Sequence, residues 1–463
     1  MGGSKSALPT AIALGIALGV VYSLSPLSVW ATFALVLLTR WAGRGLPDGE
    51  RRWVYGLLAV AIVARFVAVA VLFASTDHAR VPFGSFFGDE EYFVKRSLWL
   101  RNVALGIPIH RADLIYAFDD YSYTSYLYVL AFLQVLVGPA PYGVHLLGAA
   151  AYLTGAAILF RIVRPALGRI AAFGGLALMV LLPSLFAWSI SALKEPLYLA
   201  IGVASLWATV EAVRTSRWLL RLVLAGAVVA AVVLLQSIRE GGLAISVAGI
   251  LGGLALAWVS VRPRLASALV LAAPVIVVLV WRVPEVQVAA WRGVRQSAQV
   301  HWGHVNTSGY TYKVLDDRFY RDRSSINSMD AGETARYLVR ACVSFLVVPL
   351  PWDIESRAAL SYLPEQMVWY LMLALAPIGI VAGSRRAPLV TWMLVSFALA
   401  TAVPVALTSG NVGTLVRHRG LAIPFLVWVS AAGAAAIAAR LRRAERLDVP
   451  PPSDLMKVEP LCP

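Results

Sequence analysis

Four short segments of the sequence combine acidic and basic residues with glycine or proline, in a chain that is otherwise mostly apolar. They are residues 88–93 (GDEEYF), 191–196 (SALKEP), 237–242 (SIREGG) and 410–419 (GNVGTLVRHR). Arginine and lysine side chains bind phosphate groups, through paired N–H donors or a point charge. A nearby carboxylate can accept a hydroxyl proton or bind a divalent metal such as Mg²⁺ or Mn²⁺. These four charged segments could therefore support group transfer from a phosphate leaving group.

Each charged segment also has a simpler interpretation. The adjacent pairs Lys194-Glu195 and Arg239-Glu240 could be local ion pairs at helix ends. Arginines near a membrane can extend to lipid headgroups, and an acidic run is often a solvated loop. All four segments are nevertheless predicted at one face of the protein. Because charges beside the hydrocarbon cost free energy unless they are paired or functional, we interpret them as parts of one site.

The composition is that of an integral membrane protein. Of the 463 residues, 59% are hydrophobic and 14% are charged, whereas soluble domains average about 45–50% and about 25%. Long apolar runs recur from residue 8 to residue 438 without apolar/polar alternation, so helices rather than a β-barrel are predicted. The net charge of +15 is attributed to cytoplasmic loops, not to nucleic acid binding. Two cysteines provide no disulfide or metal framework.

Basic residues predict the topology, because cytoplasmic loops collect Lys and Arg. Placing all the basic loops in the cytoplasm predicts about twelve spans and two long outer loops, 75–121 and 282–336, with both termini inside. The basic loops are residues 40–52, 161–169, 214–221, 262–264, 385–386 and 440–446. The predicted spans are 8–24, 26–39, 53–74, 143–163, 169–187, 190–212, 218–236, 241–260, 265–281, 366–383, 388–407 and 418–438.

Two apolar segments must then not cross the membrane, because otherwise the basic loops would lie on opposite sides of it. The first, 122–137, is short and begins among tyrosines, which favour the membrane interface. The second, 337–350, contains Arg340 and ends at Pro349-Leu-Pro-Trp352. We predict interfacial or re-entrant helices there. The chain thus divides into an N-terminal hairpin and loop (1–52), a transmembrane domain (53–440) and a Pro-rich, disordered cytoplasmic tail (441–463).

The order of the charged segments and of the proline- or glycine-containing turns along the chain resembles that of a known family. An acidic pair stands in the first outer loop (Gly88-Asp89-Glu90-x-Tyr92), and a short apolar segment ends at Val137-Gly138-Pro139. Pro183 precedes a polar turn that ends at Lys194-Glu195, and Gly410-Asn411-x-Gly413-Thr414-x-x-Arg417-x-Arg419 precedes the last span. In these features the chain resembles the membrane glycosyltransferases of the GT-C fold. Relatives of this kind include protein mannosyltransferases, the aminoarabinose transferase of lipid A, and bacterial family-39 and family-83 enzymes.

The resemblance implies an enzyme of a bacterial inner membrane that transfers a sugar from a polyprenyl-phosphate carrier to an acceptor on the outer face. Asp89 and Glu90 would be the catalytic or metal-site carboxylates, and Arg417 and Arg419 would hold the carrier phosphate. Lys194 and Arg239 are further candidates for that phosphate on their chemistry. The outer loop 282–336, with His301, His304, Asp316 and Asp317, is the candidate acceptor region, and metal dependence stays open.

Two other functions are compatible with the sequence. A polysaccharide polymerase or ligase of the O-antigen type would use outer-loop arginines and histidine instead of an acidic pair. A lipid flippase or transporter would be expected to carry charges near the bilayer midplane, whereas these charges lie at helix ends. The sequence favours the glycosyltransferase, and it identifies neither the sugar nor the acceptor.

Overall fold

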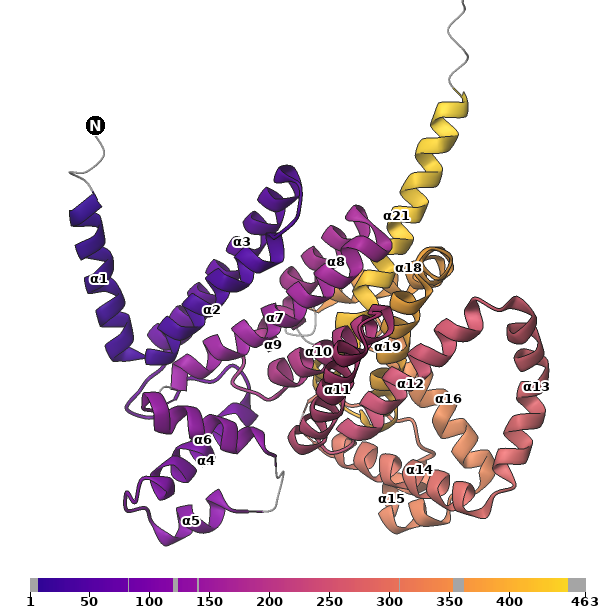
Figure 1. The fold of residues 1–463 in the computed structure, drawn as a ribbon. Coiled ribbons are helices and arrows are strands. Elements are labelled where there is room, and N and C mark those ends of the chain that lie inside the picture. The colour runs from indigo at the N-terminus through magenta and orange to yellow at the C-terminus, as the bar shows by residue number, and fades with distance from the viewer. Residues whose placement is uncertain are drawn as a thin grey trace, which may run out of the picture.

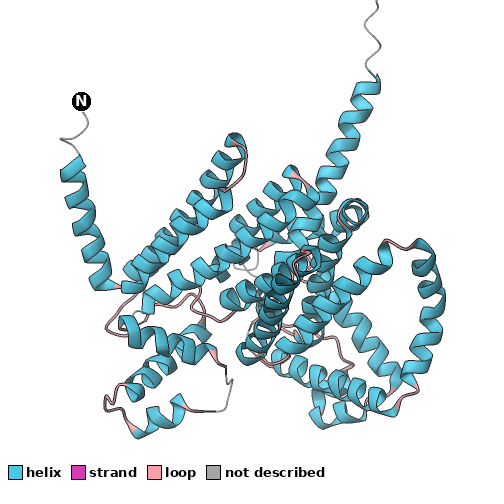
Figure 2. Cartoon of the chain, viewed as in Figure 1, coloured by secondary structure: helices cyan, strands magenta, loops and turns pink. Residues whose placement is uncertain are grey.

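A computed structural model describes residues 7–81, 83–119, 124–139, 141–307, 309–352 and 362–448. Regular secondary structure in these ranges is helical (Figure 2), and the β-type pairing there is an isolated bridge between Thr311 and Asn411. The prediction of an all-α protein is confirmed. Residues 122–123 of the predicted interfacial segment and the tail beyond residue 448 lie outside the described ranges.

Nine helices of the described chain are long and apolar enough to cross a membrane, and a bent pair raises the number to as many as ten. Each of the nine coincides with one predicted span, so the chain is a multi-pass membrane protein. They are α3 (Asp48–Ser75), α7 (Pro141–Leu167), α10 (Glu195–Arg214), α11 (Trp218–Ile238), α12 (Gly242–Ser260), α13 (Pro263–Trp281), α18 (Leu363–Arg386), α19 (Pro388–Thr408) and α21 (Ile423–Asp448). The bent pair is α8 (Arg169–Leu181) with α9 (Pro183–Ser189).

The N-terminal segment forms two consecutive 18-residue helices, α1 (Ala7–Leu24) and α2 (Pro26–Gly43), in the region of the predicted spans 8–24 and 26–39. At the other end of the chain, α21 continues through Asp448. The first eight residues of the predicted tail, 441–448, belong to this helix. Residues 440–447 (RLRRAERL) are good helix formers that extend the preceding span.

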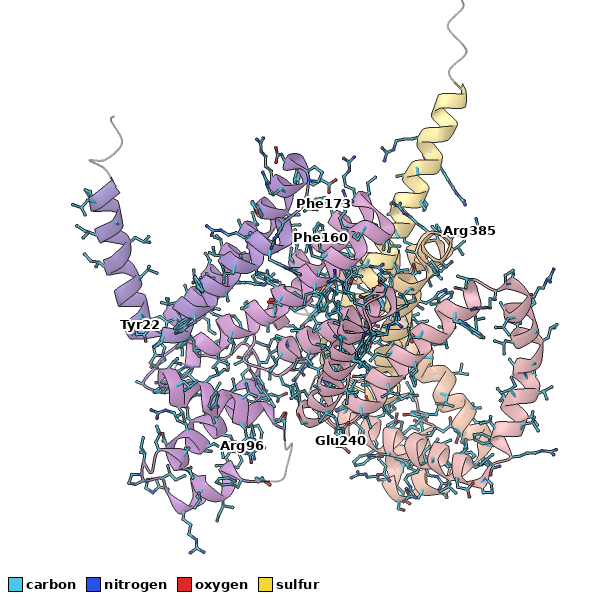
Figure 3. The ribbon with its side chains drawn as sticks, in the orientation of Figure 1. Tyr22, Arg96, Phe160, Phe173, Glu240 and Arg385 are labelled. Atoms are coloured by element: carbon cyan, nitrogen blue, oxygen red, sulfur yellow. The ribbon has the colours of Figure 1, made fainter. Side chains whose placement is uncertain are left out.

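The outward surfaces of the helices are apolar, as expected for contact with lipid. Helix α13 has no buried residue, and its Val270 and Leu271 are 73% and 79% exposed. Such a surface would be costly in water and is suited to hydrocarbon. The interior is packed in the ordinary way, as the rings of Phe160 and Phe173 show in Figure 3, with centroids 5.5 Å apart.

The bend between α8 and α9 lies at a proline, Pro183, the first residue of α9. Because Pro183 has no N–H group, the Met179 carbonyl loses its helical donor and accepts a hydrogen bond from the Tyr152 hydroxyl at 2.7 Å. The two helices meet at 63°. This bend turns the chain into a polar stretch that leads to the second charged segment.

A buried arginine satisfies the next free carbonyl at the bend. The Ser184 N–H donates to Glu365 Oε2 at 2.9 Å instead of to Val180. The Val180 carbonyl then accepts from Arg65 Nη2 at 3.1 Å, and Arg65 Nε donates to Ser189 Oγ at 2.8 Å. A charge inside a span is usually a functional candidate, but the hydrogen bonds of Arg65 assign it to holding this bend.

The predicted outer segments gather at one end of the bundle, in the lower part of Figure 1, away from the α2–α3 turn and the end of α21. The predicted cytoplasmic Arg385 lies in the upper half of Figure 3, whereas Arg96 and Glu240 lie in the lower half. The two segments predicted not to cross form the short helices α6 and α16. The helices at this end are α4 (Gly88–Ala104), α5 (Arg111–Ala117), α6 (Tyr126–Val137), α14 (Pro284–Val305), α15 (Asp317–Arg321), η1 (Arg323–Ser328) and α16 (Ala331–Val347).

Candidate functional site

A cavity of about 970 Å³ lies between the four charged segments, each of which contributes to its wall. Three cations and three carboxylates line it, together with two histidines that sequence reasoning did not place in the site. The charged lining residues are Asp89, Lys194, Glu195, Arg239, Glu240 and Arg417, and the histidines are His304 and His418. Segments that are hundreds of residues apart along the chain are thus brought together in one polar hollow, which we call the central cavity.

An alternating chain of charges crosses the central cavity. Arg417 Nη1 donates to Asp89 Oδ2 at 2.5 Å, and Arg417 Nη2 lies 3.6 Å from Glu195 Oε1. The same Glu195 oxygen lies 3.6 Å from Arg239 Nη1. The Asp89 side chain is 61% exposed, so its carboxylate is accessible to a ligand while Arg417 holds it in place.

Helix ends position these side chains. Asp89 lies in the first turn of α4, where the helix dipole favours a negative charge. Arg239 follows the last residue of α11, and the next turn is made by Gly241, whose φ of +82° is readily adopted only by glycine. Arg417 lies on the short helix α20 (Val412–Arg419), whose first turn is capped by the Asn411 side chain. The site is therefore built from helix termini at one end of the bundle.

Lys194 is the cation of the central cavity that lacks a carboxylate partner. Within the described chain its Nζ makes no ion pair, and it lies 5.9 Å from the centroid of the Phe93 ring. Burial lowers the pKa of Lys194, and Arg239 and Arg417 lower it further against the opposing effect of Glu195. A half-buried ammonium between two guanidinium groups is stabilised by an added anion.

Glu90, predicted as a catalytic carboxylate, does not line the central cavity. Its side chain is 1% exposed, and Oε2 accepts from the Phe86 N–H at 3.1 Å and lies 3.8 Å from His145 Nδ1. Burial raises the pKa of Glu90 to about 8. Neighbouring residues on a helix point about 100° apart, so Asp89 and Glu90 face different surroundings. The structure assigns Glu90 to positioning the start of α4.

Arg419, predicted to bind phosphate, also lies away from the central cavity. It is 3% exposed and donates to Gln366 Oε1 at 3.1 Å and to the carbonyls of Phe345 and Val348. Those carbonyls belong to the end of α16, so Arg419 fastens α20 to α16 and α18. Two positions along a helix correspond to about 200° of rotation, which is why Arg417 and Arg419 face opposite sides.

His304 is a residue that the sequence indicated only as part of the acceptor loop. Its Nδ1 lies 2.7 Å from the Thr408 carbonyl oxygen, which can only accept a hydrogen bond. Nδ1 therefore carries the proton and Nε2 of the neutral ring keeps its lone pair. The sequence feature that could have indicated His304 as a site residue is its i, i+3 spacing from His301. His301 points elsewhere, between the Ser409 carbonyl and the Tyr320 hydroxyl.

A stacked aromatic pair forms one side of Arg417 and was not predicted. The Arg417 guanidinium lies 4.8 Å from the centroid of the Trp188 ring. The Phe87 ring stacks on Trp188, with the centroids 4.7 Å apart and the ring planes 10° from parallel. Trp188 lies at the end of α9 and Phe87 directly before α4, so this stack couples the first two charged segments to Arg417. It fixes the guanidinium without consuming its N–H donors.

The residues that the structure describes contain no preformed cluster of metal ligands. Among them, no three His, Cys, Asp or Glu side chains are close enough to hold a metal. Asp89 and Glu195 are instead paired with arginines.

Comparisons of the chain with family models, with characterised proteins and with solved structures found no match. The site must therefore be interpreted from its own geometry.

Proposed function

We propose that the chain is a membrane glycosyltransferase that moves a sugar from a polyprenyl-phosphate carrier to an acceptor hydroxyl. The observation that supports this function best is the accessible Asp89 carboxylate beside Arg417, in a polar cavity that also holds Arg239 and the unpaired Lys194. The cations suit a phosphate, and the carboxylate suits a hydroxyl. The apolar helices of the bundle suit a lipid carrier.

The residues of the central cavity would divide the work as follows. Lys194, Arg239 and Arg417 bind the carrier phosphate and stabilise the negative charge that grows on it. Asp89 accepts the proton of the acceptor hydroxyl as its oxygen bonds to the anomeric carbon. The bond between that carbon and the phosphate oxygen breaks, and the polyprenyl phosphate leaves with the electron pair. Fixed charges near a leaving phosphate lower the barrier because they need no reorganisation.

The proposed topology extends the nine spans to twelve, by adding α1, α2 and the bent pair α8–α9. Both termini then lie in the cytoplasm, and the central cavity opens at the outer face of a bacterial inner membrane. The arrangement is supported by the basic turns and the charged segments, which lie toward opposite ends of the bundle (Figure 3). Cysteine labelling of positions 240 and 385 from one side of the membrane tests it.

The test of the proposed function compares two neighbouring carboxylates. Asp89→Asn removes the proposed base, and loss of a general base lowers turnover by about 10²–10⁴-fold. Glu91→Gln is the matched control, because Glu91 forms an ion pair with Lys95, one turn further along the same helix. Sugar transfer from a radiolabelled polyprenyl-phosphate sugar is measured with purified protein in lipid. Equal activity of Asp89→Asn and wild type would reject the assignment.

His304 supports a second candidate, a polysaccharide polymerase or ligase of the O-antigen type. That function would use His304 Nε2 as the base and Arg417 at the phosphate, and both residues line the central cavity. The two candidates predict opposite results. If His304→Gln abolishes transfer while Asp89→Asn retains it, the second function replaces the first. Uptake of labelled lipid without any chemical transfer would reject both and support a transporter.

A further inference from the structure

Helix α14 carries a second hollow beside the central cavity. This hollow measures about 660 Å³ and is lined by α14 and by Asn327 of η1. Positions 288, 292 and 296 of its wall continue at four-residue intervals to Val300 and His304, which line the central cavity. Gln296 and Val300 are one helical turn apart and lie within about 40° of each other around the helix axis, so the hollow adjoins the cavity along α14. We call the hollow the arginine groove; it is lined by Trp291, Arg292, Arg295, Gln296, Gln299 and Asn327.

The two arginines of the groove lack counter-charges. In the described chain no carboxylate lies within ion-pair distance of Arg292 or Arg295, and no carboxylate lines the groove. The Arg295 Nε atom is shielded from solvent and has no acceptor. Nearby arginines behave differently, because Arg336 and Arg340 both bond to Asp316, at 2.9 and 2.6 Å. The groove therefore presents positive charge that the fold leaves uncompensated.

The other groups of the groove suit a carbohydrate. The Arg295 guanidinium lies 5.8 Å from the centroid of the Trp291 ring, which orients both groups toward the same wall. Gln299 Nε2 donates to Asn327 Oδ1 at 3.1 Å, so the two amides are held in a fixed relative orientation. Planar amides both donate and accept hydrogen bonds, as sugar hydroxyls require. An aromatic face, amides and free guanidinium groups together favour an acidic sugar over a neutral one.

We propose that the arginine groove binds an acidic glycan, whose end extends along α14 into the central cavity as the acceptor. This proposal rests on the proposed function and specifies its acceptor as a carbohydrate with carboxylate or phosphate groups. From Gln296 to His304 the helix rises about 12 Å, so a short oligosaccharide spans both sites. Arg292 and Arg295 bind the acidic groups, and Asp89 receives the terminal hydroxyl.

The experiment measures binding apart from transfer. Full-length protein in nanodiscs of neutral lipid is titrated with an oligogalacturonate and with a neutral maltooligosaccharide of equal length. Arg292→Gln with Arg295→Gln should weaken oligogalacturonate binding by about tenfold or more, because charge-assisted hydrogen bonds to the acidic groups are lost. Trp291→Leu should weaken it while keeping the charge. Arg336→Gln with Arg340→Gln is the matched control and should leave the affinity unchanged.

The outcomes separate this proposal from the proposed function. Asp89→Asn should lose transfer at every oligogalacturonate concentration, whereas the Arg292/Arg295 double variant should lose affinity and regain transfer at high oligogalacturonate concentration, so the two failures are distinguishable. Equal affinity for both oligosaccharides, or an unchanged affinity in the Arg292/Arg295 double variant, would overturn the acidic-glycan site. If that double variant instead loses binding to vesicles of anionic lipid, with no effect on the oligosaccharide, the groove contacts lipid headgroups and the proposal is wrong.

Discussion

The central cavity and the arginine groove both contact α14, but they differ in whether their cations are paired with carboxylates. In the cavity, Arg417 and Arg239 are paired with carboxylates, and Lys194 is the one of its three cations that makes no ion pair among the described residues. In the groove, neither arginine meets a carboxylate in the described chain. A paired network holds reactive groups in place before a ligand arrives. Uncompensated cations instead gain their partner from the ligand, which suits binding without chemistry.

Breaking the paired network at its centre should have a larger effect than any other change that compares the cavity with the groove. Arg417→Met removes a phosphate ligand and the group that holds Asp89, so transfer should fall by about 10²–10³-fold. Arg417→Lys keeps the charge but loses the second contact to Glu195. Its transfer rate should lie between those of Arg417→Met and wild type. Initial rates of sugar transfer measure both. Wild-type rates in Arg417→Met would show that the network is only structural.

A smaller effect is expected for the unpaired cation of the cavity. Lys194→Gln should raise the KM for the polyprenyl-phosphate sugar by about tenfold or more, because one charge-assisted hydrogen bond to phosphate is lost. The fold should tolerate the change, since Lys194 makes no ion pair within the described chain. Lys95→Gln is the control, because Lys95 pairs with Glu91 away from the cavity. If only kcat changes, Lys194 does not hold the bound donor.

The sequence predicted the helices better than the directions of their side chains. Hydropathy located all nine membrane-spanning candidates, because crossing hydrocarbon requires long apolar runs whatever their packing. It could not separate Asp89 from Glu90, or Arg417 from Arg419, because a helix turns about 100° per residue and its rotation is set by neighbours. Those neighbours, such as Gln366 for Arg419, come from distant parts of the chain. Trp188 stayed unpredicted for the same reason.

The pH dependence of stability tests whether burial keeps the Glu90 carboxyl protonated. Its pKa is raised to about 8 from an ordinary 4.5, so between these values the folded protein keeps a proton that the unfolded chain has lost. Stability should therefore fall as pH rises through this window and level off above it. Between about pH 6 and about pH 9, wild type should lose about 2–3 kcal/mol more than Glu90→Gln, which cannot titrate. Parallel pH profiles of unfolding would show that Glu90 is ionised at neutral pH.

The smallest effect is expected where arginines are paired at the surface. Asp316→Asn leaves Arg336 and Arg340 without their shared carboxylate, yet exposed pairs contribute about 1 kcal/mol or less. We expect a small drop in thermal stability that disappears at high salt, since salt screens exposed charges. Oligogalacturonate affinity should stay the same or rise slightly, because two more cations of this loop are then free. A marked loss of that affinity would mean that paired and unpaired arginines act together, and the contrast between the cavity and the groove would no longer hold.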